Sequence, residues 1–309
     1  MINSGIRFLN RSQINDAQWN KALEGSINRN IYAYTWYLDA LCPGWCALVD
    51  GDYESIMPLP IRRKLLVDYT FMPPYCQQLG VFSRTTVDSE KLSCFLNAIP
   101  RQVRYVDLNL NAQNHQIPAG LKSESRLNLV LGLSRDIEDV RNRFSTNHKR
   151  NIRKFHDSAL LIDRMGNPEE VIRLFELGRG EWLGRYPDSD HKIFRELIAA
   201  VQDNAHVDTL IARNTEGLAM GGAVFFEAFG GSYFIFSGVS KEGREHSVMH
   251  GLVDCYLNDK SAYINFLDFE GSNSPALARF YAGFGADESV YLHIVMNRLP
   301  FPLCYLKPR

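Results

Sequence analysis

The sequence predicts an α/β protein built from two similar halves, and three observations lead to this expectation. The chain has 309 residues, enough for two domains at about 150 residues each. It is 45% hydrophobic and 22% charged with a formal net charge of -1, which excludes collagen-like and low-complexity chains. Both halves also show the same order of patterns: two helices, antiparallel strands, a helix and a strand.

The first half begins with two helices and continues with short strands. Apolar residues at three- and four-residue steps predict helices over residues 14–26, 32–41 and 87–99. Segments rich in β-branched and aromatic residues predict strands over residues 45–49, 54–62, 69–81, 103–110 and 126–133. Asp50-Gly51-Asp52 lies between the first two of these strands and predicts a hairpin turn.

Residues 134–156 predict one long helix with an acidic start and a basic end. Ser134 is the expected cap, and Asp136, Glu138 and Asp139 occupy the first turns, where the helix dipole favours negative charge. One apolar stripe consists of Ile137, Val140, Phe144, His148, Ile152 and Phe155. The other faces carry Arg141, Arg143, Lys149, Arg150, Arg153 and Lys154.

The second half repeats the order of the first. The expected strands are residues 160–164, 207–213, 219–228, 232–239, 263–269 and 289–296. The expected helices are residues 169–182, 191–202, 247–258 and 275–284. We therefore expect two domains, residues 1–133 and 134–309, with the basic helix 134–156 as the link.

Two carboxylates close the predicted strand 263–269. A tight turn at Gly271 follows, and then a helix with Ser274 as its cap and Pro275 at its first position. Strand alternation predicts that Asp268 and Glu270 share a face. Paired carboxylates can support proton transfer, although two solvated or helix-capping carboxylates would show the same pattern.

The segment DFEGSNSPALARFYAGFG resembles the carboxyl-terminal signature of the Fem-type aminoacyltransferases and the cellulose-locus (CelD or BioF2-like) acyltransferases. These families belong to the Gcn5-related N-acetyltransferase (GNAT) superfamily. The run Lys149-Arg150-Asn151-Ile152-Arg153 is similar to the basic helix that joins the two domains in that family. The resemblance spans nearly the whole chain and implies two tandem GNAT-like domains, each a mixed, mostly antiparallel sheet flanked by helices.

The sequence departs from the family patterns at two places. In GNAT enzymes that use acyl-CoA, a glycine-containing loop gives its amides to the pyrophosphate, but here Ser247 and Met249 occupy the glycine positions after Arg244. The Fem branch also lacks this loop. Tyr281 stands where Fem-type proteins have a lysine, and it could donate a proton to a leaving group or pack against the sheet.

The resemblance implies an N-acyltransferase that moves an acyl group from acyl-CoA or a carrier to an amine. The alternatives are a tRNA-dependent aminoacyltransferase that acts on a cell-wall precursor, and a non-catalytic binding protein on a degenerate GNAT scaffold. The expected co-substrate is acyl-CoA or aminoacyl-tRNA, and the expected acceptor is a small-molecule amine or a cell-envelope precursor.

We assign candidate residues to three roles. The candidates for proton transfer are Asp268, Glu270, Glu227 and Tyr281. The candidates for contacts with the donor are Ser237, Val239, Arg244, Ser247 and Asn273. The candidates for binding substrate or phosphate are Lys149, Arg150, Arg153, Lys154, Trp182 and Tyr186. The four basic side chains could equally be solvated, and the two aromatic side chains could equally pack at a helix end.

We expect no metal and a cytoplasmic location. His246 and His250 are four residues apart, but no third ligand stands at a suitable spacing. Six cysteines without a CxxC pair are typical of a reducing compartment. The amino terminus lacks the pattern of a signal peptide, and no apolar run reaches the roughly 18 residues that a membrane span needs.

Overall fold

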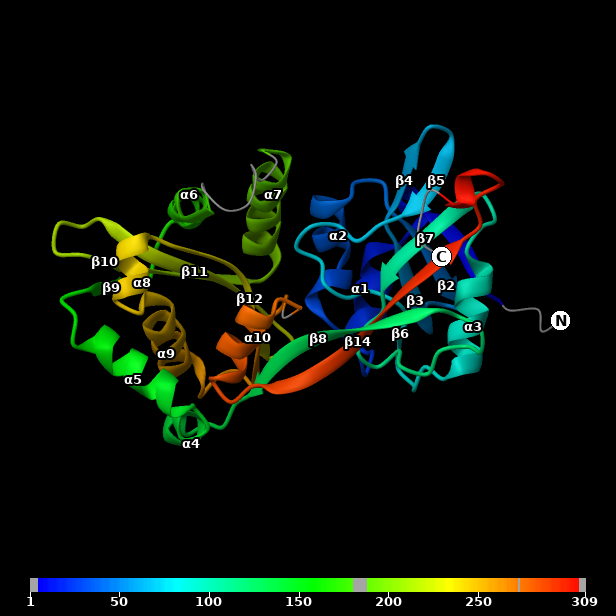
Figure 1. The fold of residues 1–309 in the computed structure, drawn as a ribbon. Helices are drawn as coiled ribbons and strands as arrows, with labels where there is room; N and C mark the ends of the chain where they lie inside the picture. Colours follow the sequence, from blue (N-terminus) through cyan, green and yellow to red (C-terminus); the bar gives the residue numbers. More distant parts are fainter. Residues whose placement is uncertain (1–4, 180–187, 272, 306–309) are drawn as a thin grey trace. The chain divides into compact units, whose positions relative to one another are not determined.

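The computed structural model describes residues 5–179, 188–271 and 273–305. The chain forms two compact units (Figure 1), the first from Met1–Leu127 with Val290–Arg309 and the second from Asn128–Ser289. The carboxyl-terminal segment belongs to the first unit because β14 (Asp287–Asn297) pairs with β7 (Val103–Asn109). This division therefore differs from the boundary that we expected after residue 133.

The first unit contains two groups of strands. β1 (Arg7–Asn10), β2 (Cys46–Asp50), β3 (Ser55–Leu59) and β6 (Phe82–Ser83) form an antiparallel sheet in that order. β4 (Ile61–Lys64), β5 (Val67–Thr70), β7 and β14 are hydrogen-bonded in that order. The helices are α1 (Asp16–Glu24), α2 (Thr35–Leu41) and α3 (Ser89–Ala98), and Leu92, Phe95, Val106 and Ile294 are among the buried core residues.

The strand expected over residues 69–81 is wrong for most of its length. β5 ends at Thr70, and the next strand, β6, begins at Phe82. Pro73 and Pro74 interrupt the segment, since a proline has no N–H group to give to a strand ladder. β1 was not predicted, because its four residues are too short to show alternation.

The second unit is one mixed, mostly antiparallel sheet. Its strands follow the order β8 (Ser123–Gly132), β13 (Phe266–Asp268), β12 (Gly231–Val239), β11 (Ala219–Ala228), β10 (His206–Arg213) and β9 (Leu161–Asp163). Only β12 and β13 run parallel within this series. The helices are α4 (Ile137–Asn142), α5 (Thr146–His156), α6 (Pro168–Arg179), α7 (Asp188–Asn204), α8 (Lys241–Glu245), α9 (Val248–Lys260) and α10 (Pro275–Ala282).

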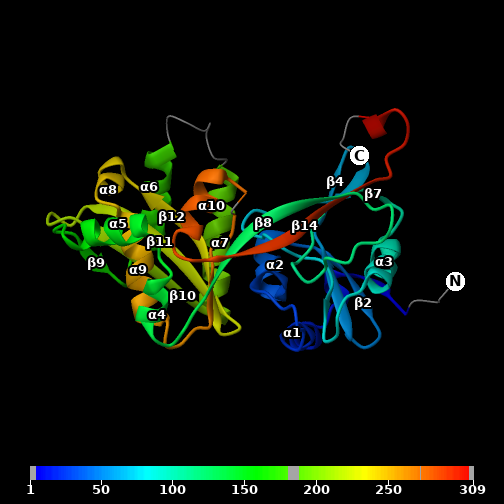
Figure 2. The same cartoon turned by 60° about the horizontal axis from the view of Figure 1, so that its bottom comes forward.

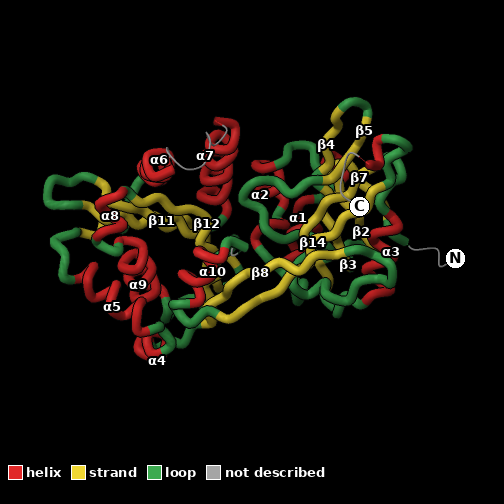
Figure 3. Tube along the Cα trace, viewed as in Figure 1, coloured by secondary structure: helices red, strands yellow, loops and turns green. Residues whose placement is uncertain are grey.

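Glycines allow helices to pack closely on both faces of this sheet. A Cβ atom on Gly238 would lie 2.5 Å from the backbone nitrogen of Phe175 in α6, and one on Gly221 would lie 2.6 Å from Val248 in α9. A Cβ atom on Gly222 would meet α6 instead, as expected because successive strand residues face opposite sides. Figures 1 and 3 accordingly show α6 and α9 on opposite sides of β11 and β12.

The single helix expected over residues 134–156 is wrong, because the structure has two helices there. Asp136 rather than Ser134 caps α4, since its side chain accepts from the backbone N–H of Glu138. Ser145 is extended and starts a new helix, because its hydroxyl accepts from the N–H of His148. The apolar stripe is confirmed at Val140, Phe144, His148 and Phe155, all of which are buried.

Most other elements of the second unit agree with the expectation within a few residues, and β11 has the predicted bounds. α8 was not predicted, because five residues are too few to show helical periodicity. The strand expected over residues 263–269 is shorter, since the N–H groups of Tyr263 and Ile264 bond to Lys260 and close the preceding helix. None of the helices in the described ranges has both the length and the apolar composition needed to cross a membrane.

Candidate functional site

The two parallel strands of the second unit, β12 and β13, are paired over a short stretch. β12 and β13 pair at Ser232 with Leu267 and at Tyr233 with Asp268. That register ends at Asp268, where β13 ends, whereas β12 continues to Val239. Ser237 and Val239, the expected donor contacts, therefore lie on the part of β12 beyond its pairing with β13, and both are half-buried.

Asp268 is the buried acid at the end of β13. Its side chain is 8% exposed. Its Oδ1 accepts hydrogen bonds of 2.9 Å from the Asn128 side chain and of 2.9 Å from the backbone N–H of Glu270. Burial raises the pKa of the Asp268 carboxyl to about 6, while these two hydrogen bonds oppose the rise. A carboxyl group with this pKa can both accept and release a proton near neutral pH.

Glu270 does not continue the strand, so the expectation that alternation places it on the face of Asp268 is wrong. Its φ is 49° and that of Gly271 is 54°, which puts both residues in the left-handed region of a tight turn. The backbone N–H of Glu270 donates a hydrogen bond to Asp268 Oδ1. The negative charge of Glu270 helps to raise the pKa of Tyr281, so Glu270 lies near Tyr281 as well as next to Asp268.

Tyr281 lies on α10 and is buried. Its ring stacks on Phe269 at a centroid distance of 4.7 Å and meets Phe234 edge-on at 6.2 Å. Burial is the main cause of the raised pKa of its hydroxyl, and Glu270 adds to it. The hydroxyl therefore stays protonated at neutral pH, and it can donate a hydrogen bond while its ring packs against the sheet.

Glu227 lies in a different group of side chains. Its carboxylate is 2.6 Å from the ammonium of Lys260 and accepts a hydrogen bond of 3.3 Å from the Tyr256 hydroxyl. The same ammonium is 2.7 Å from Asp208. Burial would raise the pKa of Asp208, but the hydrogen bond and positive charge of Lys260, together with the nearby His206, outweigh it and the pKa is lowered. The structure thus brings Glu227 together with Asp208 and Lys260.

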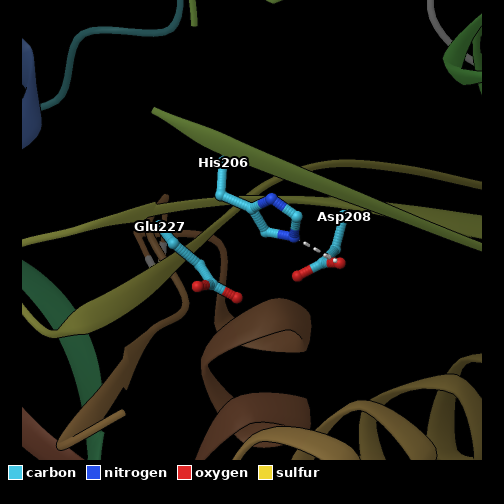
Figure 4. A group of neighbouring side chains, drawn as sticks. All are labelled: His206, Asp208 and Glu227. Atoms are coloured by element: carbon cyan, nitrogen blue, oxygen red, sulfur yellow. Dashed lines mark hydrogen bonds and ion pairs between the residues drawn. The ribbon is translucent and has the colours of Figure 1, made fainter. Parts of the chain in front are cut away.

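Three residues of this group have the chemistry of metal ligands. Figure 4 shows His206, Asp208 and Glu227, whose ligand atoms all lie within 4.8 Å of one another. His206 is 3.0 Å from Asp208. The ammonium of Lys260 already supplies positive charge to both carboxylates, so a divalent cation would have to displace it.

His250, one of the two histidines that are four residues apart, packs among other rings. The ring of His250 packs against His148 at 4.6 Å and Phe280 at 4.9 Å. Burial is the main cause that lowers the pKa of His250 to about 4. His250 therefore belongs to the packing between α5, α9 and α10.

The segment after β12 forms a helical turn instead of a phosphate-binding loop. The backbone N–H groups of Gly243, Arg244 and His246 donate to Ser240 Oγ, Ser240 O and Glu242 O. A GNAT pyrophosphate loop must instead direct such groups at the ligand. Ser247, with φ 57°, links α8 to α9. These three N–H groups are therefore not available to a pyrophosphate.

The four basic candidates lie together on the exposed side of α5. Lys149 donates to Asn142 O at 3.2 Å, and Arg150 donates to Asn147 at 2.8 Å. Within the described ranges, no ion pair to an acidic residue is found for these two or for Arg153 and Lys154. The helix borders the donor end of the site, because the Ser247 hydroxyl donates to Asn151 at 3.4 Å.

The remaining candidates are exposed or lie outside the described residues. Arg244 and Asn273 are exposed, the first on α8 and the second in the turn before α10. Trp182 and Tyr186 lie outside the described residues. Asn128 was missed by the sequence reasoning, although a polar residue within the apolar run 127–131 is a signal that a buried partner is needed.

Comparison with solved structures identifies the architecture. A structure of FemX superposes with a TM-score of 0.68 at 12% sequence identity, over 97% of this chain and 99% of that chain. The chain has a tandem GNAT fold. The structure of L-PGS from Bacillus licheniformis matches this chain with a TM-score of 0.56 at 11% identity, over 94% of this chain and 95% of that chain.

A tandem GNAT protein from the clavulanic acid biosynthesis pathway matches at 0.55 and 11% identity, over 96% of this chain and 99% of that chain. No family model matches the sequence, and no curated protein matches it. The fold class expected from the resemblance, two tandem GNAT-like domains, is therefore confirmed. At these identities the likeness concerns the fold alone.

Proposed function

We propose that this Fem-type GNAT chain transfers an acyl or aminoacyl group to an amine and forms an amide. The proposed site lies in the second unit, at the end of β13 and along the part of β12 that continues beyond it. The observation that carries the proposal is the buried carboxyl group of Asp268 at the end of β13, with its pKa of about 6. Such a group is suited to accept the proton that an amine must lose during amide formation.

In the proposed reaction the amine nitrogen forms a bond to the carbonyl carbon of the donor, and the bond from that carbon to the leaving oxygen breaks. Asp268 accepts the proton from the nitrogen, directly or through a water molecule. The Tyr281 hydroxyl, kept protonated by its burial, supplies a proton to the leaving oxygen. The donor lies along Ser237 and Val239 and extends from there toward Asp268, and holding it in this orientation lowers the entropic part of the barrier.

The structure favours an aminoacyl-tRNA as the donor over an acyl-CoA. The N–H groups of Gly243, Arg244 and His246 are used by acceptors at the start of α8 and cannot hold a pyrophosphate. The exposed cations of α5 lie beside the same end of α9, and cations of this kind bind the phosphates of nucleic acids. We propose that Lys149, Arg150, Arg153 and Lys154 contact the RNA backbone.

The proposed acceptor is a small-molecule amine or the amine of a cell-envelope precursor. The six cysteines of the chain are free thiols. Free thiols are usual in reducing compartments, so we propose that the reaction takes place in the cytoplasm.

A thermal-shift titration with a mixed pool of aminoacyl-tRNA, and in parallel with acetyl-CoA, tests this proposal. A ligand at about 100 times its Kd adds about 2.7 kcal/mol to the free energy of unfolding. We expect a shift with the tRNA that falls steeply with salt, and none with acetyl-CoA. A shift with acetyl-CoA alone would assign the donor to CoA, and no shift with either would contradict the transferase.

The variant R153S/K154S tests the role of α5. We expect it to weaken the tRNA shift, because two phosphate contacts are removed. The matched control is Lys192→Ser, which removes an exposed charge from α7 in the same unit. Equal losses in the two variants would contradict a specific role for α5.

A further inference from the structure

The tip of the β4–β5 hairpin in the first unit carries two leucines that are almost fully exposed. Leu65 is 89% exposed and Leu66 is 93% exposed. Lys64 pairs with Val67 in the hairpin, so these leucines form the whole two-residue loop. Two adjacent large apolar side chains gain nothing from exposure to water, and the fold provides no core for them to enter.

The backbone of this loop makes the leucines more unusual. Leu65 has φ 48° and Leu66 has φ 65°, so both lie in the left-handed region. Two-residue hairpins with this geometry favour Asn-Gly, because a larger side chain crowds the following carbonyl oxygen. Leucine at both positions therefore opposes folding of the turn, and its presence points to a role outside the fold.

Strand register brings two further segments to the same end of the first unit. β5 and β7 run parallel with Asp68 opposite Val103, so Arg101 and Gln102 lie beside the hairpin tip. β14 pairs with β7 at Asn297 and Tyr105, and Asn297 anchors the following turn through a hydrogen bond of 3.0 Å to Cys304 O. Figures 1 and 2 both show this carboxyl-terminal turn beside β4 and β5.

That turn is also apolar and exposed. Phe301 is 81% exposed and Tyr305 is 68% exposed. We call these residues and the cations around them the Leu65 surface. Its apolar members are Leu65, Leu66, Phe301, Leu303 and Tyr305, and its exposed cations are Arg62, Arg63, Lys64, Arg101 and Arg104.

The charge of the Leu65 surface has one sign. Asp68 is the only acidic residue within 61–69, 101–104 and 297–305, and it is bound by Arg63 through two hydrogen bonds. A second copy of this chain would bring the same cations against one another, so like-charge repulsion disfavours a dimer here. A surface that is apolar and anionic complements it instead.

We propose that the Leu65 surface binds the face of an anionic lipid bilayer. Leu65 and Leu66 enter the boundary between headgroups and acyl chains, where an exposed apolar side chain leaves water. Phe301 and Tyr305 lie at the headgroup level, which aromatic rings prefer. The cations contact the lipid phosphates, and each adds attraction to an anionic leaflet. This inference does not depend on the transferase reaction.

Vesicle flotation with the full chain tests the inference. The probes are vesicles of phosphatidylcholine alone and of phosphatidylcholine mixed with phosphatidylglycerol. We expect the protein to float with the anionic vesicles and to be released by high salt. The variant L65N/L66G should bind at least about 10-fold more weakly, since two leucines leave the interface.

Weaker binding by L65N/L66G should not be caused by unfolding of the variant. Asn-Gly suits the left-handed turn, so L65N/L66G should be at least as stable as the wild type by urea unfolding. The matched control is Leu218→Asn, which removes another exposed leucine from a turn of the second unit. It should bind vesicles as the wild type does.

A second variant tests the charges. Lys64→Ser with Arg101→Ser should weaken binding to anionic vesicles by about 10-fold or more, because each cation near such a surface contributes measurably. The proposal is overturned if the wild type floats with neither kind of vesicle. It is overturned equally if L65N/L66G binds the anionic vesicles as tightly as the wild type does. It is also overturned if the wild type is a dimer by light scattering that L65N/L66G converts to a monomer, since a second copy would then cover the surface.

Discussion

Replacing Asp268 by Asn tests the buried base without knowledge of the substrate. The amide oxygen of Asn can accept the same two hydrogen bonds, from Asn128 and from the N–H of Glu270. The charge, however, is removed. The pKa of Asp268 is raised in the folded chain from 3.8 to about 6, so the folded state binds a proton more tightly than the unfolded state does.

The sign of the effect follows from this difference. The raised pKa contributes stability that is fully present below pH 3.8 and is lost as pH rises through about 6. Each pKa unit corresponds to about 1.4 kcal/mol, so the wild type should lose about 3 kcal/mol relative to D268N between pH 4 and pH 8. The variant should therefore gain stability relative to the wild type as the pH rises to 8.

Urea unfolding of both proteins across this pH range measures the difference, and the changes that other groups cause cancel between them. Asp203→Asn is the matched control, because it removes an exposed carboxylate from the same unit. Its free energy of unfolding should stay much closer to parallel with that of the wild type across the same pH range. If the free energies of unfolding of the wild type and D268N run parallel from pH 4 to pH 8, the carboxyl group is not held in the way that the structure implies. In the proposed reaction, D268N should also reduce amide formation by about 100-fold or more.

Three further predictions concern packing and charge in the second unit. Arg141→Ala should cost about 3 kcal/mol, because it removes two hydrogen bonds from the buried Asp254 carboxylate and leaves it the contact with His156. Gly238→Ala should cost at least about 1–3 kcal/mol through its clash with α6, whereas Gly132→Ala has open space and should be nearly neutral. The lowered pKa of His250, about 4, predicts that stability is lost as pH falls below about 6.5, by about 1 kcal/mol at pH 5 after allowance for partial exposure. Urea unfolding measures all three, and a loss below 0.5 kcal/mol for Arg141→Ala would contradict the first.

Periodicity and turn residues predict the elements that bury one clear face. β11 and α10 are examples, since the first is a continuous apolar run and the second begins with Ser274 and Pro275. The break between α4 and α5 was missed because the apolar stripe continues through it. The break depends on contacts from distant parts of the chain, such as the hydrogen bond from the Ser145 N–H to Gly283 O, and local patterns do not contain them.

The candidate site shows the same limit. The sequence placed Asp268 at a strand end, which the structure confirms. The expectation that Asp268 and Glu270 share a strand face was wrong, because Glu270 and Gly271 have left-handed backbone conformations and the strand does not continue through them. The partner that the structure provides is Asn128, 140 residues away along the chain. Only the folded sheet places β8 beside β13, so no spacing rule could predict this pair.

The chemistry of Asp268 also argues for a functional role. Its two hydrogen bonds would remain with an amide in its place, so packing and hydrogen bonding alone do not require a carboxylate. The carboxylate costs about 3 kcal/mol above pH 6 by the pKa shift alone. A residue that weakens the fold at neutral pH, when a near-isosteric residue would not, is explained by what its proton does. Stability is commonly sacrificed in this way where a protein performs chemistry.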